Sequence, residues 1–338
     1  MRLILPPKEI RFEITYQCNM HCKHCYNNSG FREINELSTD EIISVLKQAD
    51  HWGVREIFFE GGEPLMRDDL FEILSYIRGK FKIGISTNGT IMNSSHIELL
   101  KNTIDFVQIS LDAATPETYE IIRGSRDYFS VVISNIKKLK LNNIPVVITM
   151  VLMKPNVHEI SKFIELTSAL GVEACAFARL QLSGRARENK DLLMLTKQEF
   201  YGAQKYISSH FKKISKFKII RSFECFYFLF EPVSFCQPAA SITIECGEGL
   251  AISPTGDVLV CNLLRDFKIG NVRKEKLETM WVNSEFLKKL RNFTIFSLCK
   301  TCDYLPVCRC GCRGCTFLET GNLYAVDPLC PFIKEKNE

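Results

Sequence analysis

Three cysteines of this 338-residue chain stand close together, at Cys18, Cys22 and Cys25, with the spacing C-x3-C-x2-C. Three thiolates in so short a loop suit an iron–sulfur cube, whose fourth iron then lacks a protein ligand. Zinc is the alternative, because His21 or His24 would supply a fourth ligand, but structural zinc usually takes its ligands as two separated pairs. The spacing therefore favours a cluster, with His24 packed beside it.

A second and larger group of cysteines stands toward the end of the chain. Its pattern is C-x14-C followed by C-x2-C-x5-C-x3-C-x17-C, formed by Cys246, Cys261, Cys299, Cys302, Cys308, Cys312 and Cys330. Cys236 precedes this pattern with nine residues between it and Cys246. A zinc ribbon needs only two close pairs, whereas seven or eight spaced cysteines suffice for two iron–sulfur cubes.

The bulk composition excludes several classes of protein. A secreted disulfide scaffold would be short and dense in cysteine throughout, whereas this chain is long and its total of 15 cysteines is odd. The net charge of +4 is mild and does not indicate nucleic-acid binding. No signal peptide and no apolar run long enough for a membrane span is visible. The expected location is the cytoplasm, where thiols stay reduced.

Short β-rich runs alternate with longer amphipathic runs between Ile10 and Phe211. The predicted strands are Ile10–Thr15, Val54–Phe59, Lys82–Ser86, Phe106–Leu111, Val146–Leu152 and Val172–Leu180. The predicted helices are Asp40–Trp52, Asp69–Ile77, Ser94–Asn102, Phe129–Leu141, Val157–Leu170 and Thr196–Phe211. A capping box, Ser38-Thr39-Asp40-Glu41, marks the start of the first helix. Six β-α units predict an α/β fold with a parallel sheet, for which an open doubly wound sheet and a partial barrel both fit.

Polar motifs follow the first four predicted strands. The first cysteine group comes after strand one, Gly61-Gly62-Glu63-Pro64 after strand two, Ser86-Thr87-Asn88-Gly89 at the end of strand three, and Ser110 with Asp112 at the end of strand four. Reactive groups of such folds gather in loops at the carboxyl ends of the strands. The four motifs are therefore expected to face one pocket.

The cysteine loop and Gly61-Gly62-Glu63-Pro64 resemble motifs of the radical S-adenosylmethionine (SAM) superfamily, over residues 9 to about 210. The resemblance implies a partial (β/α)6 TIM-like barrel. It also implies that Cys18, Cys22 and Cys25 hold a [4Fe–4S] cluster whose open iron is chelated by SAM. Reduction would then cleave SAM to methionine and a 5′-deoxyadenosyl radical, which abstracts a substrate hydrogen.

The same resemblance assigns SAM-binding roles to residues at the strand ends. Gly61 and Gly62 would let the backbone approach the SAM amino group, and Glu63, beside Pro64, would accept from that ammonium. Ser110 and Asp112 lie two apart on one expected strand, so they would point to the same side, toward the SAM ribose. Arg123 would pair with the SAM carboxylate, and the site would include Ser86 and Asn88. Turns, strand-end caps and a solvated arginine are the alternatives.

The second cysteine group resembles the SPASM domain, an extension of many radical SAM enzymes, over about residues 236 to 331. The chain would divide into a barrel (1–215), a linker (216–235) and a cysteine-rich SPASM domain (236–338). One auxiliary [4Fe–4S] cluster would take Cys299, Cys302, Cys308 and Cys330. The other would take Cys246, Cys261 and Cys312, with Cys236 a doubtful fourth ligand. Three clusters in all are implied.

Four cysteines exceed what three clusters need. Cys310 and Cys315 flank Cys312 and are either alternative ligands or packing thiols. Cys175 is expected on the sixth strand, where it would face the barrel interior, and Cys225 stands in an aromatic segment. Buried lone cysteines mostly serve packing. The functional alternative, taken from peptide epimerases of the superfamily, is that Cys175 or Cys225 returns a hydrogen atom to a substrate radical.

SPASM-containing relatives mostly modify peptides or proteins. The resemblance therefore implies a maturase that crosslinks, oxidises or epimerises a ribosomal peptide or protein, reduced by a donor such as flavodoxin or ferredoxin. Only nine residues precede the first predicted strand. A separate leader-binding protein would then help, or the peptide would bind the barrel directly.

Two further functions stay open. The ending of the chain, from Cys312-Arg313-Gly314-Cys315 to Asp327-Pro328-Leu329-Cys330, also resembles enzymes that trim haem side chains. A non-enzymatic iron–sulfur electron-transfer module would explain the later cysteines, but it leaves Gly61-Gly62-Glu63-Pro64 without a purpose.

Overall fold

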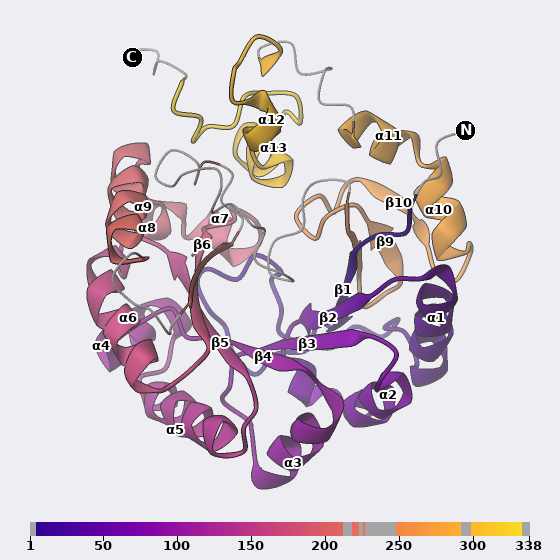
Figure 1. Cartoon of the computed structure of the whole chain (residues 1–338), viewed down its shortest axis with the longest axis horizontal. Coiled ribbons are helices and arrows are strands. Elements are labelled where there is room, and N and C mark those ends of the chain that lie inside the picture. Colours follow the sequence, from indigo (N-terminus) through magenta and orange to yellow (C-terminus); the bar gives the residue numbers. More distant parts are fainter. Residues whose placement is uncertain (1–4, 212–217, 223–225, 227–247, 292–298, 333–338) are drawn as a thin grey trace.

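Six parallel β-strands, each followed by one or more helices, form the first part of the molecule (Figure 1). A computed structural model describes residues 5–211, 218–222, 226, 248–291 and 299–332. The strands are β1 (Glu9–Thr15), β2 (Glu56–Gly61), β3 (Lys82–Thr87), β4 (Phe106–Ser110), β5 (Val146–Leu152) and β6 (Ala174–Arg179). Each pairs in parallel with the next, and helices pack on the outer face of the curved sheet (Figure 1). The predicted α/β fold with a partial (β/α)6 barrel is confirmed.

The main helices of the barrel lie where the amphipathic runs predict them. They are α1 (Thr39–Trp52), α2 (Leu70–Ile77), α3 (Ser94–Thr103), α5 (Asp127–Leu141), α6 (Ile160–Ala169) and α9 (Lys197–Phe211). Ser38 caps α1 by accepting from the backbone N–H of Glu41 at 3.3 Å, and the Glu41 carboxylate accepts from the Ser38 N–H at 2.8 Å. This is the predicted capping box, and Gly53 ends the helix with a φ of 93°.

Several short elements escape the sequence prediction. Helices α4 (Pro116–Arg123), α7 (Arg185–Glu188) and α8 (Lys190–Leu193), and the 3₁₀ turn η1 (Pro64–Met66), all lie in connections after strands. The 3₁₀ turn η2 (Val157–Glu159) forms the start of the predicted helix Val157–Leu170. Helices α7 and α8, with four residues each, are too short for a periodic apolar pattern to be recognised. Several of these short elements carry residues of the site described below.

The sheet continues beyond the barrel strands into the C-terminal part of the chain. Strand β7 (Lys218–Ser222) pairs with β6, although these residues lie in the predicted linker. At the other edge β8 (Leu250–Ile252) pairs in parallel with β1, followed by the antiparallel strands β9 (Asp257–Leu259) and β10 (Lys268–Asn271). The ten-stranded sheet runs β10-β9-β8-β1-β2-β3-β4-β5-β6-β7 and is open. The sheet therefore contains strands from before, within and after the predicted linker at 216–235.

Four short helices complete the C-terminal part: α10 (Leu277–Asn283), α11 (Glu285–Arg291), α12 (Leu305–Cys308) and α13 (Arg313–Thr320). Helix α10 packs on α1, where the Trp281 and Trp52 rings meet edge to face with their centroids 6.2 Å apart. Among the described residues, no helix is long and apolar enough to cross a membrane.

Aromatic rings fill the inside of the barrel below the carboxyl ends of its strands. The Phe58 and Phe106 rings stack with centroids 5.8 Å apart, and the Arg11 guanidinium lies 5.0 Å from the Phe58 centroid. Gly84 on β3 leaves the space for them, because a Cβ there would meet Phe106 at 2.4 Å and Phe58 at 2.6 Å. This plug confines the open space of the barrel to the ends of the strands where the polar motifs stand.

Candidate functional site

A cavity of about 190 Å³ opens at the carboxyl ends of the barrel strands. Its walls contain the three cysteines of the first loop, Cys18, Cys22 and Cys25. They also contain six of the nine predicted SAM-binding positions: Gly61, Gly62, Ser86, Asn88, Ser110 and Arg123. The four motifs predicted to share one pocket therefore do meet. Glu63, Pro64 and Asp112 do not line the cavity and lie behind its wall.

Backbone contacts set the start of the cysteine loop. The Cys18 N–H donates to the Gly30 carbonyl at 2.9 Å, and the Gly30 N–H donates to the Tyr16 carbonyl at 3.0 Å. Gly62 lies against this loop, because a Cβ on it would stand 2.2 Å from the Gln17 carbonyl oxygen. The close approach that requires glycine here is therefore to the protein's own backbone, which ties the end of β2 to the cysteine loop.

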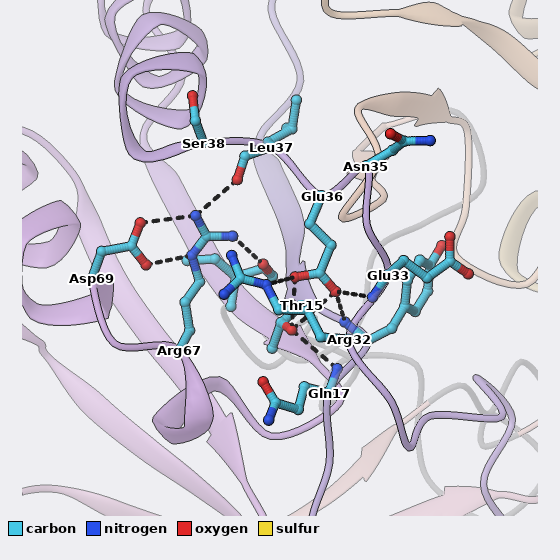
Figure 2. Close-up of polar contacts among 12 residues, drawn as sticks. Thr15, Gln17, Arg32, Glu33, Asn35, Glu36, Leu37, Ser38, Arg67 and Asp69 are labelled. Carbon is cyan, nitrogen blue, oxygen red and sulfur yellow. Dashed lines mark hydrogen bonds and ion pairs between the residues drawn. The ribbon is translucent and has the colours of Figure 1, made fainter.

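Two buried charged side chains clamp the chain on either side of the loop (Figure 2). Arg67 donates to the carbonyls of Ile14 at 2.9 Å and Leu37 at 2.8 Å. Arg67 Nε also donates to the Asp69 carboxylate at 2.6 Å. The Glu36 carboxylate accepts from the Tyr16 N–H at 2.7 Å. The chain therefore enters and leaves the cysteine loop through fixed points. Sequence reasoning missed both residues, since neither belongs to a recognisable motif.

Arg185 braces the cysteine loop from the other side of the barrel. It donates to the Cys22 carbonyl at 3.0 Å and to the Ser29 carbonyl at 2.9 Å. The preceding Gly184 has a φ of 50°, and a Cβ there would meet the Cys25 carbonyl oxygen at 2.7 Å. Arg185 lies on the short helix α7, which the sequence did not predict.

The three thiols fit an iron–sulfur cluster better than a single zinc ion. Across the described part of the chain, no group of three His, Cys, Asp or Glu side chains is placed to hold a single metal ion. In a cube each thiolate binds a different iron, so the three cysteines of one loop surround the cluster and do not meet at one ion. Donors also face the sulfurs: Arg123 Nη1 lies 3.8 Å from Cys22 Sγ, and Asn88 Nδ2 lies 3.9 Å from Cys18 Sγ. Burial raises the pKa of the Cys18 thiol to about 12, so metal binding must displace its proton.

Glu63 lies beneath the cavity rather than in it. Its carboxylate accepts from the Asn88 N–H at 2.7 Å, the Thr87 hydroxyl at 2.7 Å and the Leu65 N–H at 3.2 Å. Burial raises the pKa of this carboxyl, and those donors partly oppose the rise. Glu63 therefore joins the ends of β2 and β3, and the predicted contact with the SAM ammonium has no support in this geometry. Pro64, also buried, begins η1.

Asp112 departs from its predicted place. β4 ends at Ser110, and Asp112 has a φ of 61°, which turns its side chain out of the alternation of the strand. The prediction that Ser110 and Asp112 point to the same side is wrong for that reason. Ser110 lines the cavity, whereas Asp112 is fully buried beside it.

The buried carboxylate of Asp112 organises the charged groups next to Cys22. It accepts from Arg123 Nε at 2.9 Å, lies 3.1 Å from His24 Nε2, and accepts from the Val151 N–H at 2.7 Å. Burial would raise the pKa of Asp112, but the Arg123 charge and the His24 ring outweigh it and hold that pKa well below its usual range. Arg123 is thereby fixed at the cavity wall, with its pKa raised despite burial. His24 lines the cavity together with the three thiols, and its ring lies against Asp112.

Four buried polar atoms of residues in the cavity wall have no hydrogen-bond partner among the described residues. They are His24 Nδ1, Ser29 Oγ, Thr149 Oγ1 and Gln181 Oε1. Buried polar groups are nearly always satisfied in proteins, because an unpaired one costs roughly 1 to 3 kcal/mol. A polar molecule in the cavity would supply the missing partners. The wall is therefore suited to SAM and a polar substrate.

The barrel wall on the side of β1 and β2 carries charges that the sequence analysis did not assign. Arg11 Nη1 donates to Glu60 at 3.1 Å, Asn262 Nδ2 donates to Glu60 at 3.1 Å, and Arg11, Glu60 and Asn262 all line the cavity. Nearer the carboxyl end of β1, the fully buried Glu13 pairs with Arg265, and burial raises the pKa of Glu13 to about 7. The alternation of charged and apolar residues from Glu9 to Glu13 was the signal that could have revealed this wall.

Four of the predicted auxiliary ligands meet in a second pocket. Cys299, Cys302, Cys308 and Cys330 line it together with Cys310. The remaining walls are apolar, formed by Phe226, Tyr304, Leu305, Val326 and Phe332, and the Tyr304 and Phe332 rings stack at 4.8 Å. Four thiols around an apolar pocket are the donor set of a [4Fe–4S] cluster. These residues fit the group.

The predicted ligands of the other auxiliary cluster are described only in part. Cys312 and Cys315 are buried with Leu263, and Cys261 packs against them. Cys236 and Cys246 lie outside the described residues, as does Cys225. The pKa of Cys312 is lowered to about 7 by the hydrogen bond from Cys315 and by the nearby Arg179 charge.

Cys175 does not face the barrel interior. The neighbouring Ala174 and Ala176 pack with Phe106 inside the barrel, so the pleat of β6 turns Cys175 toward the helices, where it hydrogen-bonds with Thr167 of α6. The predicted orientation is wrong by one step of the strand alternation. Cys175 therefore lies away from the cavity, and a role as hydrogen donor loses its basis.

Comparison with protein families matches both halves of the chain. Residues 12–167 match the radical SAM superfamily, and residues 246–303 match the SPASM iron–sulfur cluster-binding domain. The first match contains the cysteine loop and all four strand-end motifs. The second contains Cys246, Cys261, Cys299 and Cys302.

Solved structures with the same fold extend over almost the whole chain. SuiB from Streptococcus suis, bound to S-adenosylmethionine, is 19% identical over 96% of this chain and 77% of its own, with a TM-score of 0.76. SuiB bound to its precursor peptide SuiA is 18% identical over 97% and 76%, with a TM-score of 0.78. The protein anSMEcpe with bound AdoMet and the Cp18Cys peptide is 18% identical over 96% and 94%, with a TM-score of 0.75. With both family matches in place on this shared fold, the chain belongs to the radical SAM superfamily and is a radical SAM enzyme with a C-terminal SPASM domain.

Proposed function

We propose that the enzyme modifies a residue of a peptide or protein that enters the barrel cavity. When bound, a [4Fe–4S] cluster on Cys18, Cys22 and Cys25 supplies the electron that cleaves SAM into methionine and a 5′-deoxyadenosyl radical. The observation that carries the proposal is the cavity itself, in which the three thiols, Arg123 and the unpaired Ser29, Thr149 and Gln181 atoms share one wall.

The chain's own residues bind and orient in this proposal. Arg123, held by Asp112, is placed to receive the SAM carboxylate, and Ser86, Asn88 and Ser110 present amide and hydroxyl groups from β3 and β4. Gly61 and Gly62 keep the end of β2 close to the cysteine loop. The aromatic plug beneath the cavity excludes water from below, which protects a radical from side reactions.

The charge pattern of the cavity favours a peptide over a tetrapyrrole. Arg11 pairs with Glu60, Arg123 with Asp112, and Arg179 with Asp327. The fourth arginine of the wall, Arg185, donates to the carbonyls of Cys22 and Ser29, so each of these guanidinium groups already has a protein partner. Gln108, Thr149, Gln181 and Asn262 instead present neutral groups that hydrogen-bond well with peptide amides. Peptides are also present in the SuiB and anSMEcpe structures, with SuiA and Cp18Cys respectively.

We further propose two auxiliary [4Fe–4S] clusters in the C-terminal part, one in the pocket of Cys299, Cys302, Cys308 and Cys330. A low-potential electron donor of the flavodoxin or ferredoxin class would reduce the enzyme. A separate leader-binding protein remains a prediction.

Anaerobic reconstitution with iron, sulfide, dithionite and SAM tests the first step. Production of 5′-deoxyadenosine is expected from the wild-type chain and from Cys175→Ala, which removes a buried thiol outside the cavity. It should be absent from Cys22→Ala. Absence of 5′-deoxyadenosine from the fully loaded wild-type enzyme would overturn the function.

Co-expression with a short peptide encoded beside the gene tests the substrate. Mass spectrometry should find a defined mass change on the peptide with the wild-type enzyme and none with Cys22→Ala. Turnover of a tetrapyrrole with no change on any peptide would replace the proposed substrate with the haem-type alternative.

A further inference from the structure

Cys310 lies in the auxiliary pocket although no cluster of the proposed function requires it. The pocket is lined by Cys299, Cys302, Cys308 and Cys330, and Cys310 completes a ring of five thiols. Its side chain is only 3% exposed and hydrogen-bonds with the Cys299 thiol. The two sulfurs therefore occupy neighbouring positions at one side of the pocket.

The backbone at Cys310 is held in a conformation that a side chain disfavours. Its φ is 69°, and the flanking Arg309 and Gly311 also have positive φ values of 50° and 76°. The left-handed region suits glycine, because a Cβ there crowds the following carbonyl. Strained backbone of this kind clusters at functional sites. A plain packing role would be served better by glycine at this position.

The surrounding contacts hold the strained turn in place. Asp327 accepts from the Cys312 N–H at 2.9 Å and from Arg179 at 3.0 Å, and its carboxylate packs so closely on Gly311 that a Cβ there would lie 2.6 Å away. The turn from Arg309 to Cys312 is thereby fixed against the barrel. Cys310 is presented to the pocket by this frame rather than by chance placement of a mobile loop.

We propose that Cys310 is a reserve ligand of the auxiliary cluster in this pocket, able to replace Cys299 on the same iron; this rests on the auxiliary cluster of the proposed function. In the exchange the iron–sulfur bond to Cys299 breaks and one to Cys310 forms. The proton passes from the Cys310 thiol to the released Cys299 thiolate, its hydrogen-bond partner, so no electron is gained or lost. The side-chain hydrogen bond of Cys310 goes to Cys299 and not to Cys302, so Cys302 serves as the comparison position in the same pocket.

Iron and sulfide analysis of full-length variants tests the exchange, in a Cys18/Cys22/Cys25→Ala background that retains about eight irons in two cubes. Cys299→Ala should keep about eight irons, because Cys310 takes over, whereas Cys302→Ala should fall toward about four. Cys299→Ala combined with Cys310→Gly should fall as Cys302→Ala does. The same iron content in Cys299→Ala and Cys302→Ala, whether both are low or both are unchanged, would overturn the reserve role.

A second measurement avoids variants that fail to fold. Cys310→Gly places glycine where the φ favours it, so the variant should fold at least as well as the wild type. Its auxiliary cluster should nevertheless lose iron to a chelator several-fold faster, because no thiol recaptures an iron released by Cys299. Cys175→Ala is the control for removal of a buried thiol. A rate in Cys310→Gly equal to that in Cys175→Ala would contradict the proposal.

Discussion

Arg123 owes its position to a carboxylate that the sequence motif did not identify as its partner. Asp112, Arg123 and His24 form one buried charged group against Cys22, in which Asp112 alone is negative. A guanidinium paired along one edge keeps its remaining N–H groups in a fixed direction, which a flexible lysine does not. The ion pair with Asp112 therefore decides where the Arg123 guanidinium lies beside the cysteine loop.

Replacement of Arg123 tests its proposed role toward SAM. Arg123→Lys keeps the charge but loses the planar fork, so the dissociation constant of SAM should rise about 10- to 100-fold, or about 1.4 to 2.8 kcal/mol. Equilibrium dialysis with the reconstituted enzyme measures it. Arg126→Lys, at an exposed ion pair with Glu117, is the matched control and should bind SAM normally. Equal affinity in the two variants would remove Arg123 from the SAM site.

Glu13 gives a pH dependence of stability that can be isolated. Burial raises its folded-state pKa to about 7, so the folded protein binds more protons than the unfolded chain between about pH 4.5 and 7. Its contribution is present below the unfolded pKa and is lost as the pH rises through 7, by at most about 3 kcal/mol. Glu13→Gln should therefore unfold with a smaller difference between pH 5 and pH 8 than the wild type. The same difference in both proteins would refute the raised pKa.

At the scale of elements, the cysteine loop is shaped by contacts between strand ends. The end of β2 touches the loop through Gly62, α7 holds it through Arg185, and the Arg67 and Glu36 clamps fix the chain before and after it (Figure 2). A loop of three cluster ligands has little structure of its own, so neighbouring elements must fix the direction of each thiol. Those neighbours are brought together by the parallel sheet.

Gly62→Ala should therefore disturb the cluster loop while leaving the rest of the barrel folded. The added Cβ would stand 2.2 Å from the Gln17 carbonyl oxygen, which is backbone and cannot move alone. The variant should lose about four irons after reconstitution, and far-UV circular dichroism should stay near wild type. Gly202→Ala in α9 is the control, since a Cβ there meets nothing within 4 Å and should raise stability by roughly 0.5 to 1 kcal/mol. Full iron content in Gly62→Ala would show that the loop tolerates the shift.

At the scale of the whole molecule, the C-terminal part is built onto the barrel rather than appended to it. β8 extends the sheet beside β1, and α10 packs on α1 (Figure 1). Arg273 also forms an ion pair with Glu41 of α1 at 2.6 Å. On the opposite side Arg179, at the end of β6, pairs with Asp327 and Glu319. Arg179 of the cavity wall is thus paired with Asp327, which stands next to Val326 of the auxiliary pocket.

Arg179→Met tests this connection. The substitution leaves the buried carboxylates of Asp327 and Glu319 without their cation, and breaking a buried pair in this way costs about 3 to 5 kcal/mol. The free energy of unfolding should fall by that amount, and the auxiliary clusters should become easier to remove. Arg126→Met, in the exposed pair with Glu117, should leave the free energy of unfolding almost unchanged, because water screens that pair. Similar losses in the two variants would show that the Arg179 pairs add little.

Prediction from sequence succeeded where a local pattern suffices. The β5 strand was predicted over its observed range, Val146–Leu152, and α1 within one residue, because apolar periodicity and the capping box act over a few neighbouring positions. Cysteine spacing likewise identified both groups of thiols that now line pockets. Prediction from sequence failed at β7 and β8, because these short strands form by pairing with the edges of the barrel sheet.

What the sequence by itself determined is the chemistry available and the order of the elements, since these depend on residue type and on spacing along the chain. Only the tertiary structure decided which side chains reach the cavity. A one-residue step of the pleat turned Cys175 outward, and a positive φ withdrew Asp112 from the wall. Folding also brought Arg179 to Asp327, which is far away in the chain. It brought Cys310 to Cys299 through a strained turn. Such contacts depend on packing between distant segments, which no local pattern encodes.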